Sequence, residues 1–323
     1  MRAVRGTGTG VAVVDVPAPD GDGVTVRVRS AGICGSDLHL LSFGWPITLG
    51  HEFAGELEDG TPVAVQPTVP CGQCDFCAAG QDQLCRTVVQ RMHGVSLDGG
   101  LADEVRVDPS CLVRLPSGVK VEDAALVEPV AVAVHALRQV ALGVGQRLLV
   151  VGAGSIGQLV VAVARHQGLD VSVVARHPTQ REAAEKLGAT VLPASPVDRA
   201  AAAAAGGADE HDVVIDAAGT QSSLDLAIER VRPGGSVIVV ATYWSPVEIG
   251  HALLGKEVRL VPAFTYGHHG ALREFEEAAA ILASGPHIPD AVVTHRVALE
   301  EAVLAFQLAA DRRSGAIKVL VEP

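Results

Sequence analysis

The chain has 323 residues and a formal net charge of −12, because 25 lysines and arginines face 37 aspartates and glutamates. This acidic balance repels phosphate groups and argues against nucleic-acid binding. Hydrophobic residues make up 48% of the chain, which excludes intrinsic disorder and provides a core for each of two domains.

The sequence predicts neither a transmembrane helix nor a signal peptide. The apolar stretch 148–164 contains three glycines and is bounded by arginines, whereas a spanning helix needs about 20 apolar residues without such breaks. The first residues lack the continuous apolar segment of a signal peptide. We therefore expect a cytoplasmic location, in which the six cysteines are thiols or metal ligands.

The N-terminal part is predicted to be an all-β unit, because short runs of β-branched residues alternate with Gly, Pro and Asp clusters. These strand candidates are residues 24–28, 61–65 and 105–107. Near the C-terminus, residues 271–284 and 299–311 have amphipathic helical patterns, and a strand-like run follows at 316–321. We expect this last segment to fold back onto the N-terminal unit.

The region from residue 142 onward changes character, because strand-like runs alternate with helical stretches. The strand candidates are residues 147–151, 171–174, 190–192, 212–216, 236–240 and 258–261. Such alternation indicates an α/β fold with a doubly wound parallel six-stranded sheet of the Rossmann type.

A glycine motif, Gly152-Ala-Gly-Ser-Ile-Gly157, follows the first of these strands and precedes a helical run at 158–165. Its glycines allow a tight turn and a close backbone approach, and the helix N-terminus favours a pyrophosphate. The motif therefore predicts dinucleotide binding. Its candidate cofactor-binding residues are Gly152, Gly154, Ser155, Ile156 and Gly157.

The end of the second strand indicates which dinucleotide is bound. An acidic residue about 20 positions after the glycines normally holds the adenosine ribose, but this chain has Ala175, Arg176 and His177 there. Because arginine can pair with a 2′-phosphate, NADP(H) is favoured over NAD(H). Alternatively, Arg176 stacks on adenine or is solvated, and NAD(H) binds through the backbone. Gly219 and Thr220 are further cofactor-binding candidates.

Four cysteines, Cys71, Cys74, Cys77 and Cys85, share one glycine-containing loop. Four thiolates at this spacing can close a tetrahedron around Zn²⁺ and leave no open position. An iron–sulfur cluster also uses four cysteines, but its usual run has a different interval before the last one. The loop therefore predicts a structural zinc site.

A second metal-ligand set consists of Cys34, His51 and a carboxylate, supplied by Glu52 or Glu128. One thiolate and one carboxylate neutralise Zn²⁺, and three protein ligands leave a coordination position for a substrate oxygen. Each residue alone has another interpretation. Cys34 could be a small buried residue, His51 a core histidine, and Glu128 a carboxylate at a helix N-terminus.

Taken together, these motifs resemble the zinc-dependent medium-chain alcohol dehydrogenase family, especially its sorbitol and threonine dehydrogenase branch. The resemblance covers nearly the whole chain. It rests on Gly32-Ile-Cys-Gly-Ser-Asp37 with His39, Gly50-His-Glu52, the four-cysteine loop, Asp98-Gly-Gly100, Val127-Glu-Pro129, the glycine motif and Ser314-Gly-Ala-Ile-Lys318.

The resemblance implies a GroES-like β-rich catalytic domain, residues 1–131 with 266–323, and a Rossmann domain, residues 132–265. It also implies two zinc ions per chain, one catalytic and one structural. Family members usually form dimers or larger assemblies, so a homodimer or homotetramer is expected.

By the same resemblance, Cys34 and His51 are catalytic-zinc ligands. Related enzymes take the third ligand from either glutamate, and Glu128 is preferred here over Glu52. Asp37 is expected to orient His51 through its other ring nitrogen, as carboxylates do behind metal-binding histidines.

The implied reaction is reversible hydride transfer between an alcohol (a secondary alcohol, a diol or a polyol) and the nicotinamide cofactor. Ser36 is expected to hydrogen-bond the reacting oxygen and pass its proton on. His39 would deliver that proton to solvent through the cofactor ribose, since an imidazole exchanges protons near neutrality.

The substrate pocket is predicted from two aromatic pairs, Phe43 with Trp45 and Tyr243 with Trp244. These aromatic residues could equally be ordinary packing. Residues 40–49 are less polar than in typical polyol enzymes of the family, which weakens a sugar-alcohol assignment. Three competing functions remain: a zinc-free quinone reductase, a non-catalytic zinc-containing dinucleotide sensor and a zinc-ribbon nucleic-acid binder.

Overall fold

The computed structural model describes residues 1–41, 46–143, 145–194 and 210–323. The chain folds into two compact units. Unit 1 combines Met1–Ala131 with Tyr266–Pro323, and unit 2 is the continuous segment Val132–Thr265. Each unit has its own β-sheet, so the two can be described separately.

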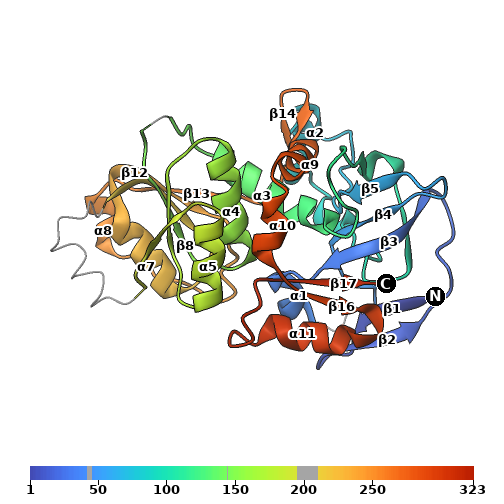
Figure 1. Cartoon of the computed structure of the whole chain (residues 1–323). Helices are drawn as coiled ribbons and strands as arrows, with labels where there is room; N and C mark the ends of the chain where they lie inside the picture. Colours follow the sequence, from blue (N-terminus) through green and yellow to red (C-terminus); the bar gives the residue numbers. More distant parts are fainter. Residues whose placement is uncertain (42–45, 144, 195–209) are drawn as a thin grey trace. The chain divides into compact units, whose positions relative to one another are not determined.

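Unit 1 is built on a seven-stranded sheet in the order β16-β17-β3-β4-β5-β7, with β6 paired to β3. These strands are β3 (Val24–Gly32), β4 (Glu52–Glu56), β5 (Pro62–Val65), β6 (Glu104–Val107), β7 (Leu112–Arg114), β16 (Val293–Ala298) and β17 (Lys318–Glu322). A separate hairpin joins β1 (Arg2–Gly6) to β2 (Val11–Asp15). In Figure 1 the red C-terminal strand β17 lies beside the blue strand β3, with which it pairs antiparallel.

Buried and exposed side chains alternate along β3, and the buried ones belong to the core of unit 1. Val26 and Val28 are buried in a cluster that also holds Phe53 and Leu101, whereas Arg27 is exposed. Successive side chains of a strand point to opposite faces, so these valines lie on the buried face. The helices of unit 1 are α1 (Gly35–Leu40), α2 (Asp75–Ala78), α9 (Glu274–Ser284), α10 (His287–Val292) and α11 (Ala302–Ala310), and α3 (Val127–Arg138) continues into unit 2.

Unit 2 contains a parallel six-stranded sheet in the order β10-β9-β8-β11-β12-β13, which confirms the predicted Rossmann topology. Its strands are β8 (Leu148–Val151), β9 (Val171–Val174), β10 (Thr190–Leu192), β11 (His211–Asp216), β12 (Val231–Val239) and β13 (Arg259–Pro262). Its further helices are α4 (Ser155–His166), α5 (Pro178–Lys186), α7 (Gln221–Arg230) and α8 (His251–Gly255). The strand order reverses between β8 and β11, which is where ligands bind in such sheets.

Two predicted helices differ from the structure in their bounds. The first begins only at Glu274, because a short hairpin of β14 (His268–His269) and β15 (Leu272–Arg273) precedes it. The second starts with a 3₁₀ turn, Leu299–Glu301, before α11. Strand β16 and helix α10 were not predicted at all.

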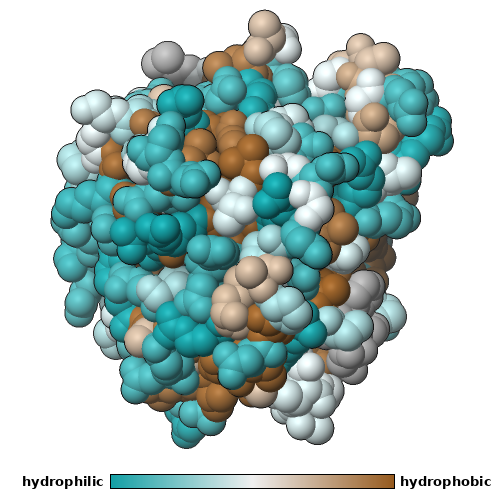
Figure 2. All heavy atoms as spheres, turned by 90° about the vertical axis from the view of Figure 1, so that its right-hand side faces the viewer, coloured by the Kyte–Doolittle hydropathy of each residue, from teal (hydrophilic) through white to brown (hydrophobic). Residues whose placement is uncertain are grey.

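The surface in Figure 2, which is one face of the molecule, is largely hydrophilic, with hydrophobic residues scattered among the hydrophilic ones. Within the described ranges, no helix has the length and apolar character required to cross a membrane.

Candidate functional site

The first candidate site is a cluster of metal-ligating side chains in unit 1. Strand β3 pairs with β4 so that Gly32 lies opposite Glu52, which brings the residues after β3 beside those that open β4. The ligand atoms of Cys34, His51 and Glu52 consequently lie within 4.8 Å of one another. A thiolate, an imidazole and a carboxylate at this spacing fit the donor set of a zinc site with an open position.

Asp37 supports two members of this cluster at once. It is fully buried in the first turn of α1, where its Oδ2 accepts a hydrogen bond from the backbone N–H of Cys34 at 2.9 Å. Its Oδ1 lies 3.2 Å from Nδ1 of His51. The Nε2 atom of His51 is then left for a metal, and Ser36 Oγ lies 3.5 Å from it. Asp37 therefore lies where a carboxylate can orient His51. The proton-relay role of Ser36 stays a prediction.

Glu52 is also half of a buried ion pair. Nζ of Lys318 lies 2.7 Å and 2.6 Å from the two Glu52 oxygens, and it donates to the carbonyl of Ile33 at 3.1 Å. Burial acts to lower the pKa of Lys318, but the charges of Glu52, Cys34 and Glu128, with the hydrogen bond to Glu52, together raise it. A side chain at position 32 would displace the Glu52 carboxylate, because a Cβ there would lie 2.0 Å from Glu52 Oε2.

Glu128 is not a member of the ligand cluster. It lies in the first turn of α3, where burial raises its pKa to about 7; the charge of His51 acts to lower this pKa and that of Glu52 acts to raise it. The carboxylate grouped with Cys34 and His51 is therefore Glu52, the second choice of the sequence analysis. Glu128 can instead hold a proton beside the cluster at neutral pH.

Sequence reasoning missed two residues of this region. Tyr266 is buried, and its pKa is raised well above the usual value by burial and by the charge of Glu128. Lys318 belongs to a motif that supported the family resemblance but received no role of its own. The available signal was a single lysine within the otherwise apolar run 316–321.

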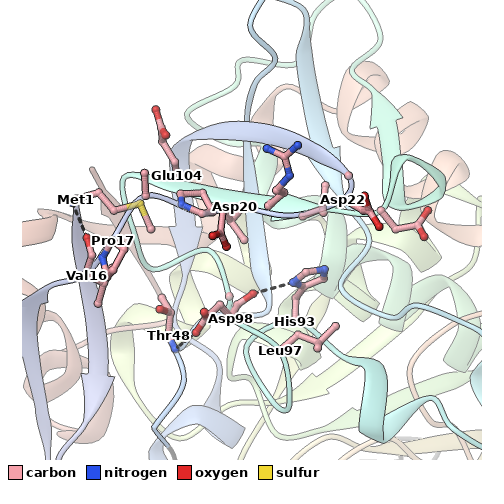
Figure 3. Close-up of a pocket in the computed structure, with 18 of the residues that line it drawn as sticks. Met1, Val16, Pro17, Asp20, Asp22, Thr48, His93, Leu97, Asp98 and Glu104 are labelled. Carbon is pink, nitrogen blue, oxygen red and sulfur yellow. Dashed lines mark hydrogen bonds between the residues drawn. The ribbon is translucent and has the colours of Figure 1, made fainter.

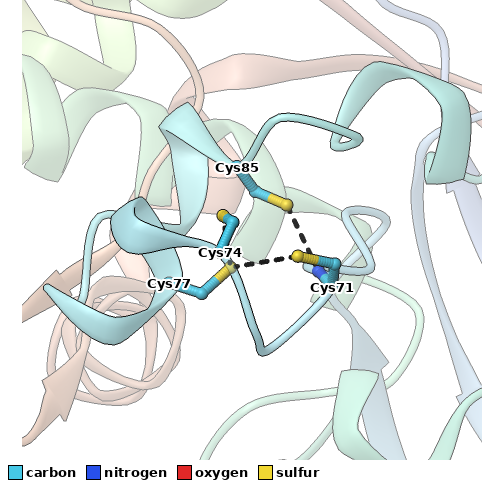
Figure 4. Close-up of side chains that lie close together, drawn as sticks. All are labelled: Cys71, Cys74, Cys77 and Cys85. Atoms are coloured by element: carbon cyan, nitrogen blue, oxygen red, sulfur yellow. Dashed lines mark hydrogen bonds between the residues drawn. The ribbon is translucent and has the colours of Figure 1, made fainter.

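The second candidate site is the four-cysteine loop, also in unit 1. Figure 4 shows the sulfur atoms of Cys71, Cys74, Cys77 and Cys85 directed toward one another, and all four lie within 4.8 Å. Burial acts to raise the pKa of the Cys85 thiol, but backbone N–H groups of Cys71 and Thr87 outweigh it and lower that pKa to about 6. An easily ionised thiol within a closed set of four fits a structural zinc site.

The third candidate site is the glycine turn of unit 2. Gly152 has φ +103°, and a Cβ on Gly157 would lie 1.8 Å from the Gly152 carbonyl oxygen, so both positions require glycine. By contrast, no atom lies within 4 Å of a Cβ built on Gly154, and the Ser155 Oγ is buried without a hydrogen-bond partner. Helix α4 starts there without a side-chain cap. These features fit a pyrophosphate at the helix N-terminus.

The turn after β9 carries cations and no carboxylate. Ala175 is buried, Arg176 is exposed, and His177 is the N-cap residue of α5. Arg181, which sequence reasoning missed, donates a hydrogen bond from Nη1 to the Arg176 carbonyl at 3.2 Å. Its guanidinium group therefore lies over the same turn.

The remaining predicted residues are distributed as follows. Gly219 has φ +65°, and Thr220 caps helix α7 by accepting a hydrogen bond from the Ser223 N–H at 3.1 Å. The Tyr243 hydroxyl donates to Asp216, and Trp244 is 47% exposed. His39 lies exposed on α1. Phe43 and Trp45 lie outside the described residues, and Ile156 is half-buried at the start of α4.

Unit 1 also has a cavity of about 580 Å³ that the sequence analysis did not anticipate. Figure 3 shows Asp20, His93 and Asp98 on its walls, with Nδ1 of His93 lying 2.7 Å from the Asp98 carbonyl. Burial lowers the pKa of His93. None of the described residues that line this cavity is a metal-ligand or cofactor-binding candidate.

Comparison with known proteins decides the family. Residues 20–117 match the alcohol dehydrogenase GroES-like domain, and residues 155–284 match the zinc-binding dehydrogenase domain. The L-galactonate-5-dehydrogenase of Escherichia coli (strain K12) is 31% identical over 287 residues, which cover 84% of this chain and 83% of that protein. The chain belongs to the zinc-dependent medium-chain alcohol dehydrogenase family. As a member of this family it is an oxidoreductase, and the predicted GroES-like and Rossmann folds are confirmed.

Further relatives of this dehydrogenase agree. The sorbitol dehydrogenase of Bacillus subtilis (strain 168) is 29% identical over 321 residues, covering 92% of this chain and 89% of that protein. A crystal structure of a zinc-binding dehydrogenase from Sinorhizobium meliloti 1021 bound to NADP is similar with a TM-score of 0.84 and 30% identity. That comparison covers 100% of this chain and 99% of the other. Together they support an alcohol or polyol dehydrogenase.

Proposed function

We propose that this chain is a zinc-dependent dehydrogenase that transfers a hydride reversibly between an alcohol and NADP(H). The observation that carries the proposal is the Cys34, His51 and Glu52 cluster, whose ligand atoms lie within 4.8 Å in the GroES-like unit. A zinc ion bound there would supply a Lewis acid that polarises the carbon–oxygen bond of the substrate. The substrate class is a secondary alcohol, a diol or a polyol, in line with the dehydrogenases that resemble the chain.

In this proposal two zinc ions bind per chain. Cys34, His51 and Glu52 hold the catalytic ion, and the four cysteines of the 71–85 loop hold the structural one. Lys318 offsets one negative charge of the catalytic cluster through its 2.6 Å contact with Glu52. Glu128, with its pKa raised to about 7 by burial, holds or releases a proton beside the cluster near neutrality.

The proton of the alcohol requires a route to solvent, and helix α1 provides two groups for it. Ser36 Oγ lies 3.5 Å from His51 Nε2, next to the atom that faces the metal position. His39 is exposed and follows Ser36 by three residues, so both side chains lie on one face of the helix. Ser36 acts as a relay, since its hydroxyl oxygen accepts the proton while its own hydroxyl proton is passed on. His39 then delivers a proton to solvent.

The preference for NADP(H) rests on the turn after β9. Arg176 and Arg181 lie at this turn together with His177, and the position of the usual ribose-binding carboxylate is occupied by Ala175. Guanidinium groups can pair with a 2′-phosphate, which a carboxylate would repel. The relative from Sinorhizobium meliloti, which binds NADP, supports this assignment.

The function is tested by metal analysis together with an activity screen. We expect about two zinc ions per chain and oxidation of secondary alcohols, diols or polyols with NADP⁺ in preference to NAD⁺. Cys34→Ser should lose one zinc and all turnover, while Cys74→Ser should lose the other zinc. A wild-type chain without zinc, or one that consumes no cofactor with any alcohol or ketone, would contradict the proposal.

We also propose that the chain forms a homodimer or a homotetramer. Analytical sedimentation measures this oligomeric state.

A further inference from the structure

We propose that Tyr243 is a positioning residue for the nicotinamide half of the cofactor, fixed in place by its hydrogen bond to Asp216. This inference rests on the proposed dinucleotide site. It changes the interpretation of Tyr243, whose ring was predicted as a pocket wall without any account of its hydroxyl group.

Asp216 is the central acceptor at the end of β11. Its side chain is fully buried, and its Oδ1 accepts backbone hydrogen bonds from Ala218 and Gly219 at 2.9 Å and 3.2 Å. Its Oδ2 accepts from Ser223 Oγ at 3.1 Å and from the Tyr243 hydroxyl at 2.6 Å. Three of these four donors belong to the segment that directly follows Asp216. Tyr243 is the donor that comes from a different strand connection, so this bond joins two segments.

The turn that follows Asp216 at the end of β11 packs against the ends of both neighbouring strands, β8 and β12. A Cβ on Gly152 would lie 2.8 Å from the Ala218 Cβ, so the turn after β11 contacts the glycine motif after β8. A Cβ on Gly219 would lie 2.7 Å from the Thr242 carbonyl oxygen, so the turn also contacts the residue before Tyr243. Asp216 therefore links three adjacent carboxyl ends of the sheet, those of β8, β11 and β12.

The sheet order places Tyr243 on the nicotinamide side. A Rossmann sheet consists of two mononucleotide-binding halves that meet where the strand order reverses, here between β8 and β11. Arg176 follows β9 in one half, which is the half assigned to the adenosine phosphate. Tyr243 follows β12 in the other half, which is left for the nicotinamide.

The chemistry of Tyr243 restricts it to a positioning role. The Tyr243 hydroxyl already donates its proton to Asp216, and burial and that carboxylate raise its pKa above the usual value of a tyrosine. The hydroxyl is therefore not a proton donor for the substrate. The half-buried ring remains available as an apolar surface whose place is set by the bond.

The test compares two ligands that differ in the nicotinamide half. Tyr243→Phe removes one oxygen atom and keeps the ring, and we expect it to weaken NADPH binding about three- to tenfold, the equivalent of one hydrogen bond. Binding of 2′,5′-ADP, which has no nicotinamide, should stay unchanged. Both affinities are measured by fluorescence titration or calorimetry, which require no turnover. Ser284→Ala removes a hydroxyl group from α9 in unit 1 and serves as the matched control.

The weakening of NADPH binding by Tyr243→Phe must also depend on Asp216. Asp216→Asn should weaken NADPH binding, and adding it to Tyr243→Phe should produce less than the product of the two single effects. If Asp216→Asn does not fold, the comparison of NADPH with 2′,5′-ADP binding by Tyr243→Phe alone still tests the inference. The inference would be overturned if Tyr243→Phe lost equal affinity for NADPH and 2′,5′-ADP, or if its affinity for NADPH were unchanged. If the wild type instead binds NADH and 5′-AMP, the NADP preference fails, and the same comparison with that ligand pair decides the role of Tyr243.

Discussion

Nζ of Lys318 lies 2.6 Å from Oε2 of Glu52, and both side chains are almost completely buried. A buried ion pair contributes little over an apolar pair of the same shape, but the loss of one partner leaves an uncompensated charge. The pair therefore supplies the buried Glu52 carboxylate of the ligand cluster with its counter-ion.

Lys318→Met should lower the free energy of unfolding of the metal-free protein by about 3 to 5 kcal/mol, because Glu52 loses its counter-ion. Adding Glu52→Gln should recover part of this loss. Denaturant titration after chelation measures both effects. Arg29→Gln, which breaks the surface pair of Arg29 with Glu56, is the matched control and should cost no more than about 1 kcal/mol.

Asp37→Asn should reduce zinc affinity at the Cys34, His51 and Glu52 cluster by about 10- to 100-fold, the usual effect of removing a carboxylate behind a metal-binding histidine. The reason is its double contact with the Cys34 N–H and with Nδ1 of His51. Competition with a chromogenic chelator measures the affinity, and the zinc held by the four cysteines should remain. Unchanged affinity at both sites would show that Asp37 has no such role.

Arg176→Ala should raise the Michaelis constant for NADP⁺ by about 10- to 100-fold, since a charge-assisted hydrogen bond to the 2′-phosphate is lost. The constant for NAD⁺ should change little. Arg181→Ala should act in the same direction, because its guanidinium lies over the same turn. Arg165→Ala, an exposed change on α4, provides the control. Equal effects on the two cofactors would contradict the preference for NADP(H).

His211 should make stability depend on pH. Burial and the charge of Arg147 lower the pKa of His211 in the folded chain, so the unfolded chain binds more protons as the pH falls below about 6.5. His211 thus contributes stability that is present above pH 6.5 and is lost on acidification. Unfolding of the wild type and of His211→Gln at pH 7.5 and 5.5 should show a smaller loss for the variant. The exposed His166→Gln on α4 should behave as the wild type.

The metal and cofactor motifs could be predicted because their geometry is local. Cys71, Cys74, Cys77 and Cys85 occupy one loop, and the glycine motif specifies a turn between a strand and a helix. These short spacings determine which atoms meet, whatever the rest of the chain does. The Rossmann sheet could be predicted for a similar reason, since each of its strands is a short apolar run between turn signals.

Contacts between distant segments could not be predicted in the same way. Lys318 and Glu52 are separated by 266 positions, and the pairing of β17 with β3 that brings their segments together has no local signal. The grouping of Glu52 with Cys34 and His51 depends on another such pairing, that of β3 with β4. The hydrogen bond from Tyr243 to Asp216 joins the ends of two strands, and no spacing rule predicts it.

Unit 1 is assembled from segments on both sides of unit 2, and this has a consequence for biosynthesis. The Rossmann unit is continuous, so all of its residues are translated before β16 and β17. Since domains generally fold as units during synthesis, we expect the nascent chain to acquire its dinucleotide-binding half first. The Cys34, His51 and Glu52 cluster, whose carboxylate pairs with Lys318 of β17, is then completed last.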